Sequence, residues 1–299
     1  MFRRTLLTLA AAALTTAIIP ATVHAQQGAS PMPTPATSGY VPVEGGKVYY
    51  ATYGQGSASH VPLVLLQGGL MTIETFGPVL EKLARSRQVI AVEAQGHGRT
   101  GPLDRPMSFA AMAADVAAVI AWLGLGNVDV LGYSMGGTIG LRLALDRPEL
   151  VKRLVIASSV YAFAGWHDYN QQGMRGLSSA AAPMMVGTPL YEAFAAVNPD
   201  PATNFPRLLD QMKYMGEDYD YSTEIANLKA PTQLIVGDWD AVRTSHTVKF
   251  WELLGGGLQD AGWDNSGMNH NRLAILPGVT HYTMMTEPRL AETALAFLS

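Results

Sequence analysis

The stretch V-L-G-Y-S-M-G-G, residues 130–137, decides the fold of this 299-residue chain. It has the form Gly-x-Ser-x-Gly and lies between an apolar run and a helical pattern. In a sharp strand-to-helix turn, the flanking glycines avoid clashes, and the strained backbone lifts the serine hydroxyl clear of the sheet. The helix N-terminus presents backbone N–H groups to developing negative charge. Ser134 is therefore a candidate nucleophile; the alternative is a Gly-rich turn in which Ser134 only caps the helix.

Short apolar runs on both sides of this turn predict a mostly parallel sheet. Unbroken Val/Ile/Leu runs of four or five residues suit strands that helices cover on both faces. Helical patterns separate several runs, and this alternation is typical of a doubly wound α/β fold. A hairpin is also expected over 41–53, with its turn at Gly45-Gly46. The runs are 62–66, 88–92, 128–131, 154–157, 232–236 and 273–276, and the helical patterns are 108–123, N-capped by Ser108, 136–145, 244–254 and 287–298.

One long segment interrupts the alternation of strands and helices. From about 160 to 229 there is no strand pattern, and the segment is rich in aromatic residues and methionine. It is expected to be an inserted, largely helical subdomain. Ligands of open α/β sheets bind outside the carboxyl ends of the strands, and the insertion leaves from that edge. We therefore expect a lid over the site, in which Trp166 and His167 either line the acyl pocket or serve only in packing.

The first 25 residues are typical of an export signal. Arg3 and Arg4 precede an uncharged apolar run, 6–19, and a small-x-small cleavage sequence ends at Ala25. The arginine pair also resembles a twin-arginine signal. The alternative is a retained membrane anchor, but the run is short for a transmembrane helix. Residues 1–25 are predicted to be a signal peptide, which implies a periplasmic or secreted protein without stable membrane insertion after signal removal.

Composition restricts the organisation and the partners of the remaining chain. Residues 26–38 are rich in Pro, Ser and Ala and are expected to be a flexible linker, followed by one α/β domain over 39–299. The chain has no cysteine, so it has no disulfide framework, which suits the periplasm or secretion. The full chain's 20 Lys and Arg against 24 Asp and Glu, without a basic stripe, argue against nucleic acid. The sequence makes no prediction of the oligomeric state.

A glycine-rich loop follows the run 62–66 and offers Ser134 an electrostatic partner. The sequence there is Gln67-Gly68-Gly69-Leu70. Such a loop can turn a backbone N–H toward the serine, and together with the N–H of Met135 it would make a two-donor oxyanion hole. The alternative is a plain turn between a strand and a helix.

Candidates for the base and the acid follow the last two apolar runs. His281 comes after a run and a Gly-containing loop, and histidine is the natural base for a serine hydroxyl. Its second ring nitrogen needs an acceptor. Asp238 and Asp240 both follow the run 232–236 in the sequence G-D-W-D. Being two residues apart, they point the same way in an extended segment, so alternation does not choose between them.

These motifs, in the order Ser, Asp, His, resemble the α/β-hydrolase superfamily, in the group with a lid between strands six and seven. The resemblance covers roughly 40–299. It implies an oxyanion role for Gly69, because the family's His-Gly appears here as Gln67-Gly68. It implies that Asp240 is the acid, because related hydrolases carry it as Gly-x-x-Asp. The family's acid-x-x-Gly-x-Gly-x-Ser/Thr loop appears here as E-A-Q-G-H-G-R-T, residues 93–100.

The combined prediction is a serine hydrolase that cleaves small-molecule carboxylic esters through an acyl-enzyme. Ser134 would be the nucleophile, His281 the base, Asp240 the orienting acid, and Gly69 and Met135 the oxyanion hole. By resemblance, a serine nucleophile argues against haloalkane dehalogenases and epoxide hydrolases, which use a carboxylate. Lactone, amide or C–C bond hydrolysis and perhydrolysis by the same residues stay open, as does a non-catalytic binding protein on this scaffold.

The remaining candidates are assigned structural roles. Asp238 would be a loop acid that bonds backbone N–H groups of the turn. His97, in the 93–100 loop, is interpreted as a structural histidine, with a catalytic role as the alternative. Asp260, Asp264 and His270 match no metal-binding spacing, and no G-x-G-x-x-G or P-loop is present, so neither a metal nor an organic cofactor is expected.

Overall fold

The computed structural model describes residues 32–299, so the predicted signal peptide and the first residues of the predicted linker lie outside the described residues. The first strand, β1, spans Thr37–Val43. The last two residues assigned to the linker, Thr37 and Ser38, therefore already belong to the sheet, where they pair with Thr52 and Ala51.

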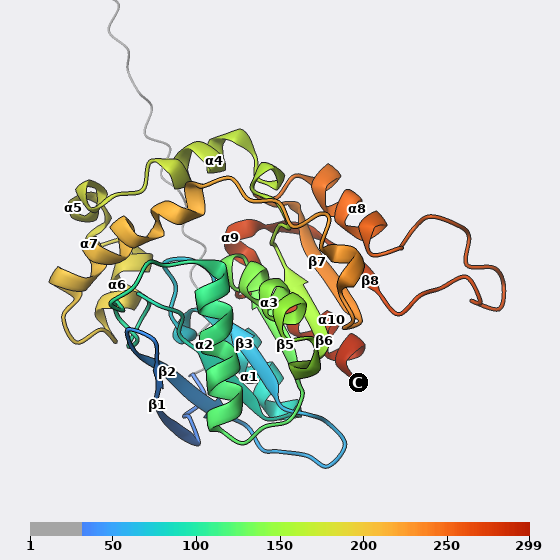
Figure 1. The fold of residues 1–299 in the computed structure, drawn as a ribbon, viewed down its shortest axis with the longest axis horizontal. Helices are drawn as coiled ribbons and strands as arrows, with labels where there is room; N and C mark the ends of the chain where they lie inside the picture. The colour runs from blue at the N-terminus through green and yellow to red at the C-terminus, as the bar shows by residue number, and fades with distance from the viewer. Residues whose placement is uncertain (1–31) are drawn as a thin grey trace, which may run out of the picture.

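An eight-stranded sheet runs through the middle of the molecule (Figure 1). Its strand order is β1-β2-β4-β3-β5-β6-β7-β8. The first two pairs in this order are antiparallel and the other five are parallel. The mostly parallel α/β fold is confirmed, and every predicted run is a strand. After β1 the strands are β2 Gly46–Tyr53, β3 Leu63–Leu66, β4 Val89–Val92, β5 Val128–Tyr133, β6 Val151–Ala157, β7 Thr232–Trp239 and β8 Arg272–Thr280.

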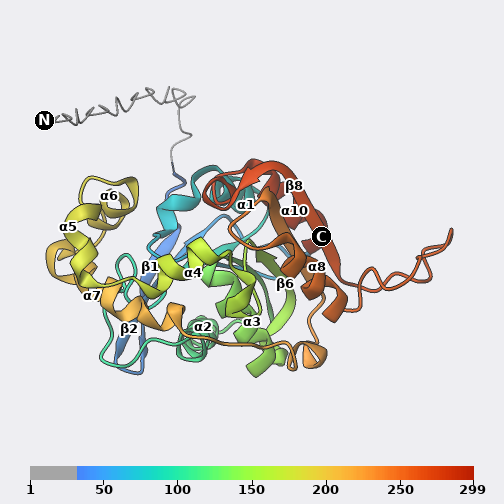
Figure 2. The same ribbon diagram turned by 90° about the horizontal axis from the view of Figure 1, so that it is seen from above.

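Helices cover both faces of the sheet, as the views in Figures 1 and 2 show. On one face lie α2 (Phe109–Trp122), α3 (Met135–Asp146) and α8 (Thr244–Leu253), and on the other lie α1 (Gly77–Ser86) and α10 (Pro288–Leu298). The four predicted helices are confirmed, and the Ser108 hydroxyl caps α2 by accepting from the Ala111 N–H at 3.1 Å. Helix α1 was not predicted, because Gly77-Pro78 at its start resembles a turn.

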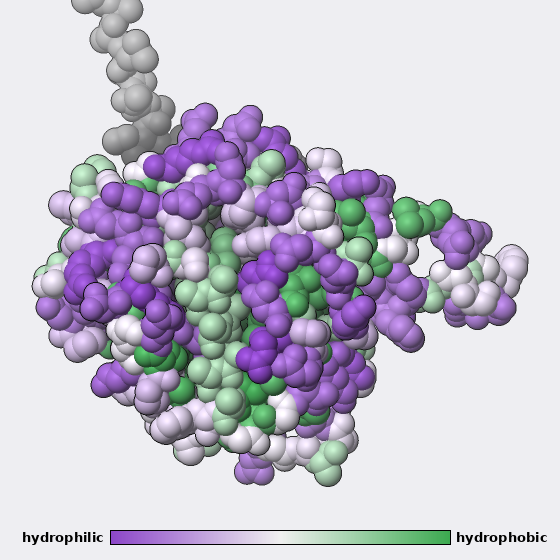
Figure 3. Space-filling view, in the orientation of Figure 1, coloured by the Kyte–Doolittle hydropathy of each residue, from purple (hydrophilic) through white to green (hydrophobic). Residues whose placement is uncertain are grey.

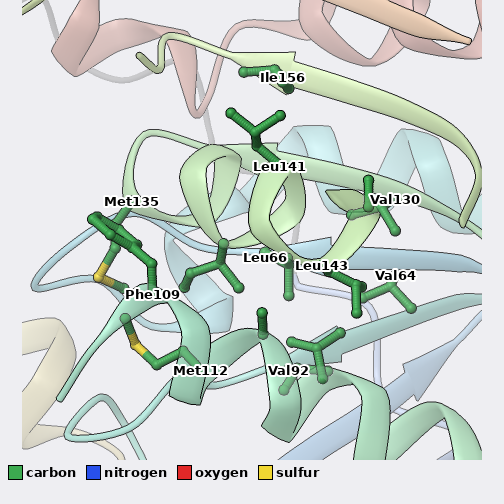
Figure 4. Packing of buried hydrophobic residues seen from close by; sticks show 14 of the residues in the cluster. Val64, Leu66, Val92, Phe109, Met112, Val130, Met135, Leu141, Leu143 and Ile156 are labelled. Carbon is green, nitrogen blue, oxygen red and sulfur yellow. The ribbon is translucent and has the colours of Figure 1, made fainter. Parts of the chain in front are cut away.

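The core lies in two layers between the sheet and the helices. Figure 4 shows the layer beneath α2 and α3, where side chains of four strands meet those of both helices. The strands contribute apolar residues to both layers, which is why their sequences do not alternate. The labelled members of this layer are Val64, Leu66, Val92, Phe109, Met112, Val130, Met135, Leu141, Leu143 and Ile156, all buried.

The insertion predicted at about 160–229 lies between β6 and β7 and is helical. In Figure 1 it arches over the upper edge of the sheet. Its contacts tie it to the 93–100 loop, since Asn198 Nδ2 donates to the carbonyl of Gly98 at 2.6 Å. The helices of this lid are α4 Asp168–Arg175, α5 Ala182–Met185, α6 Pro189–Ala195 and α7 Pro201–Gln211, followed by the 3₁₀ helix η5 Met212–Gly216.

Two surface features complete the fold. The alanine-rich side of α2 faces outward beside α3, and Figure 3 shows an apolar band on this face, where Figure 1 places α2. Between α8 and β8 a long loop, 254–271, projects from the body (Figure 2).

Among residues 32–299, no helix combines the length and the apolarity that crossing a bilayer requires.

Candidate active site

Ser134 stands on a sharp turn between β5 and α3. Its backbone has φ 53° and ψ −119°, a strained conformation for a residue with a side chain. The two flanking glycines are required by close packing. A Cβ on Gly132 would overlap the carbonyl of Gly136, and a Cβ on Gly136 would overlap the carbonyl of Leu66. The predicted strand–turn–helix at residues 130–137 is therefore the conformation that the structure shows.

Three of the predicted residues meet at the carboxyl ends of their strands. The Oγ of Ser134 lies 3.1 Å from Nε2 of His281, and Nδ1 of His281 lies 2.8 Å from Oδ1 of Asp240. Because the carboxylate accepts, Nδ1 carries the ring proton and leaves Nε2 as an acceptor for the serine hydroxyl. Ser134 and Asp240 are each 8% exposed, so the hydroxyl and the carboxylate are largely shielded from bulk water.

Asp240 is held by four donors. Besides His281, it accepts from the Ser158 hydroxyl at 2.5 Å and from the N–H groups of Val242 at 3.1 Å and Gly237 at 3.3 Å. Burial alone would raise the pKa of Asp240, but the contacts with His281 and Ser158 outweigh it and hold this pKa below its usual value. The carboxylate is therefore ionised at neutral pH.

Ser158 was not singled out from the sequence. It directly follows β6, is buried, and has φ 50°. The signal that could have found it is its place at the carboxyl end of the strand next to β7, which carries the acid. That neighbourhood depends on strand order, which the sequence alone does not specify.

Asp238 serves a different contact from Asp240. It is exposed, and its Oδ1 accepts from the N–H groups of Gly278 at 2.8 Å and Val279 at 3.2 Å. These residues belong to the end of β8, just before His281. Asp238 thus ties the end of β7 to the strand that carries the histidine, and it does not contact the imidazole.

The backbone and ring of His281 are fixed from two further sides. The hydroxyl of Tyr133 donates to the His281 carbonyl at 2.5 Å. The ring of Trp166 meets the imidazole edge-on, with 5.4 Å between ring centres. A hydroxyl of Thr280 accepts from the Thr283 N–H and caps the short helix α9, His281–Met284. The imidazole is therefore positioned before a substrate binds.

The predicted oxyanion donors flank Ser134. Met135 is the first residue of α3, where helix N–H groups lack intrahelical acceptors. Gly69 borders the same cavity as Ser134. Within residues 32–299, neither the Gly69 nor the Met135 N–H donates to a protein acceptor. In the described part of the chain, both N–H groups therefore lack a protein acceptor.

A cavity of about 160 Å³ opens at Ser134. The lid forms much of its wall, and Asn170 Nδ2 donates to the Tyr282 hydroxyl at 3.3 Å across its rim. Trp166 lines it, whereas His167 is exposed and lies outside it, so the pocket role considered for His167 is wrong. The lining residues are Gly69, Leu70, Ser134, Trp166, Asn170, Met174, Leu177, Met212, Met215, Ala241, His281 and Tyr282.

The weaker candidates lie elsewhere. His97 is fully buried, contacts the 67–70 loop through the N–H of Leu70, and does not line the cavity. Asp260 and Asp264 close their own turns by accepting from the N–H groups of Gly262 and Ser266. In the part of the chain that the structure describes, no three acidic, histidine or cysteine residues form a metal-binding group.

Comparison with known proteins identifies the family. Residues 61–229 match the α/β hydrolase fold family. The chain belongs to this family. The α/β hydrolase is 38% identical over 102 residues to the sn-1-specific diacylglycerol lipase ABHD11 of Xenopus laevis, which covers 33% of this chain and 32% of that protein. It is 32% identical over 134 residues to a proline iminopeptidase of Clostridioides difficile, covering 44% and 46%.

The chain spans about a third to just under half of the length of these curated relatives. Among solved structures, the α/β hydrolase resembles carboxylesterase CesB from Bacillus subtilis, with a TM-score of 0.63, 19% identity, and coverage of 88% of this chain and 91% of that one. At this identity the likeness concerns the fold. The relatives include a lipase and a peptidase, so family membership does not fix the substrate class.

Proposed function

We propose that this α/β hydrolase is a serine hydrolase that cleaves carboxylic esters through an acyl-enzyme intermediate. The observation that carries the proposal is the continuous hydrogen-bond chain from Ser134 through His281 to Asp240. At its serine end, this chain opens onto the cavity. A serine hydroxyl becomes a nucleophile when a base within hydrogen-bond reach accepts its proton and a third group orients that base. Both conditions are met by these distances.

The reaction runs in two halves. His281 takes the proton of Ser134 as the serine oxygen attacks the ester carbonyl, and the N–H groups of Gly69 and Met135 receive the oxyanion. The tetrahedral intermediate expels the alcohol, which His281 protonates. A water molecule, deprotonated by the same histidine, then attacks the acyl-enzyme. The second tetrahedral intermediate breaks its bond to the Ser134 oxygen, releases the acid, and the proton on His281 returns to that oxygen. Asp240 stays ionised and stabilises the imidazolium in both halves.

The cavity supports an uncharged substrate. Among the twelve lining residues of the described chain, none has a permanently charged side chain, and the lid contributes sulfur and hydrocarbon surface from Met174, Met212 and Met215. A carboxylate or ammonium buried there would lose its hydration without gaining an ionic partner. Burying even a neutral polar group without a hydrogen bond costs on the order of 2–7 kcal/mol, and burying a charged group costs more. This favours neutral esters and disfavours peptides with charged termini.

The proposal is tested with a panel of neutral p-nitrophenyl esters beside lactones, amides and dienoic ketones, and with a fluorophosphonate label. The parent should hydrolyse esters fastest and take the label on Ser134. Ser134→Ala should take no label and lose turnover by about 10⁴-fold or more. Equal ester rates for the parent and Ser134→Ala would contradict the proposal, and a faster rate on another bond type would move the reaction to that class.

A further inference from the structure

His97 connects two loops behind the cavity. It is fully buried in the 93–100 loop, and its Nε2 lies 3.0 Å from the N–H of Leu70, in the loop that also contains Gly69. Leu70 has φ 63°, a conformation that costs energy for a residue with a side chain. The His97–Leu70 bond is therefore positioned to maintain a strained conformation directly beside the predicted oxyanion donor.

The partners of His97 define its protonation. Its Nδ1 lies 2.8 Å from the carbonyl of Gln95, which only accepts, so Nδ1 carries the proton. Nε2 faces the Leu70 N–H, which only donates, so Nε2 carries no proton and accepts this hydrogen bond. His97 is thus a neutral imidazole that donates on one side and accepts on the other. Burial lowers the pKa of His97 to about 4, in agreement with this neutral form.

Two hydrogen bonds orient both peptide units that flank Gly69. The Leu70 N–H points to His97, and the Gly68 carbonyl accepts from the Met71 N–H at 3.4 Å. In a trans peptide the N–H points opposite to the C=O. The Gly69 N–H, which shares a peptide with the Gly68 carbonyl, therefore points away from the Met71 N–H.

We propose that His97 is a positioning residue for the oxyanion hole: by accepting from Leu70, it holds the Gly69 N–H toward the substrate oxygen. This inference rests on the proposed function. A second contact from the same loop, Glu93 Oε1 to the Ile73 N–H at 3.5 Å, is longer and lies further from Gly69. The His97–Leu70 hydrogen bond is thus the shorter of these two contacts and the one nearer to Gly69.

Two substitutions separate acceptor chemistry from packing. His97→Gln keeps an oxygen able to accept near the position of Nε2, whereas His97→Leu fills similar space without an acceptor. For His97→Leu on a neutral ester, kcat should fall by about 10- to 100-fold, approaching the loss of one oxyanion donor, with KM changed by less than about two-fold. The inhibition constant of an alkyl boronic acid, which places an oxygen in the hole, should rise in parallel. His97→Gln should stay within about three-fold of the parent.

A folded His97→Leu with parental kcat would overturn the inference, and so would equal losses in the Leu and Gln variants. His246→Leu is the control, because His246 is another inward-facing histidine that accepts a backbone N–H, from Tyr161 at 3.3 Å, away from this loop. It should leave kcat and boronic acid inhibition unchanged.

Hydrogen exchange of the Leu70 amide gives a readout that needs no turnover. In a Ser134→Ala background, this amide should be protected with His97 or Gln at position 97 and should exchange faster in His97→Leu. An amide that exchanges equally fast in all three contradicts the His97 proposal. A parent that hydrolyses no ester and takes no fluorophosphonate contradicts the proposed function instead, so the two failures are distinguishable.

Discussion

Ser158 donates a hydrogen bond to Asp240 across two neighbouring strands, with 2.5 Å between the two oxygens. The serine follows β6 and the aspartate follows β7, so the bond exists only when these strands lie side by side. It occupies the carboxylate oxygen that His281 leaves free. The orientation of the acid is therefore set from two directions.

Ser158→Ala removes one of the four donors to an ionised carboxylate. A hydrogen bond to a charged group contributes about 1.5–3 kcal/mol, so we expect a loss of stability of about that size and turnover lowered by several-fold. Ester kinetics and thermal unfolding check both. Ser159→Ala is the control, since its hydroxyl bonds Thr138 at 3.0 Å and does not touch Asp240. Equal turnover in the two variants would show that Ser158 does not act on the acid.

Asp240→Asn and Asp238→Asn separate the two neighbouring acids. Asp240→Asn should cut kcat by about 10⁴-fold, because the amide no longer maintains the tautomer of His281 that accepts the serine proton. Asp238→Asn should stay within about ten-fold, because an amide oxygen can still accept from Gly278 and Val279. The measurement is kcat on a neutral ester. The reverse order of the two losses would move the acid role to Asp238.

Met212→Ala tests how the lid limits the acyl group. The Met212 side chain is buried and lies against Gly69, so its truncation opens space beside the attacked carbonyl. Each buried methylene of a substrate contributes about 0.8 kcal/mol, so kcat/KM for octanoate relative to acetate esters should rise by about ten-fold or more. Met184→Ala, an exposed residue of the same lid, is the control. An unchanged ratio in Met212→Ala would contradict this boundary of the pocket.

Acid should destabilise the protein partly through His97. Its pKa falls from 6.5 when unfolded to about 4 when folded, so between these values the unfolded chain binds more protons and stability declines as pH falls. The full contribution is about 3 kcal/mol. Burial raises the pKa of Glu93 to about 7, which acts in the opposite direction, with stability declining as pH rises from 4.5 to 7.

The His97→Gln variant isolates this contribution, because Glu93 remains in both proteins. Between pH 6.5 and 4, its stability should fall less than that of the parent by up to about 3 kcal/mol, measured by urea unfolding at each pH. Parallel curves would show that His97 titrates normally in the folded protein.

The features of the fold that could be predicted from the sequence are those that depend on neighbouring residues. Unbroken apolar runs predicted the parallel strands because burial on both faces selects such runs, and the Gly-x-Ser-x-Gly turn predicted the conformation of Ser134. Local pattern could not choose between Asp238 and Asp240, which required the resemblance to a family. It also could not reveal Ser158 or the His97–Leu70 bond, because both contacts depend on which strands and loops become neighbours in space.

The residues of the candidate site come from the ends of several strands, and this has a consequence for refolding. Ser134 and His281 are 147 residues apart in sequence, and β5 and β8 are separated in the sheet by β6 and β7. Contacts between such distant segments form slowly, because loop-closure entropy must be overcome first. Catalytic turnover should therefore return only after that half of the sheet has assembled, and later than the helix content returns. The rate at which ester hydrolysis returns during refolding would therefore measure how fast β5 to β8 assemble.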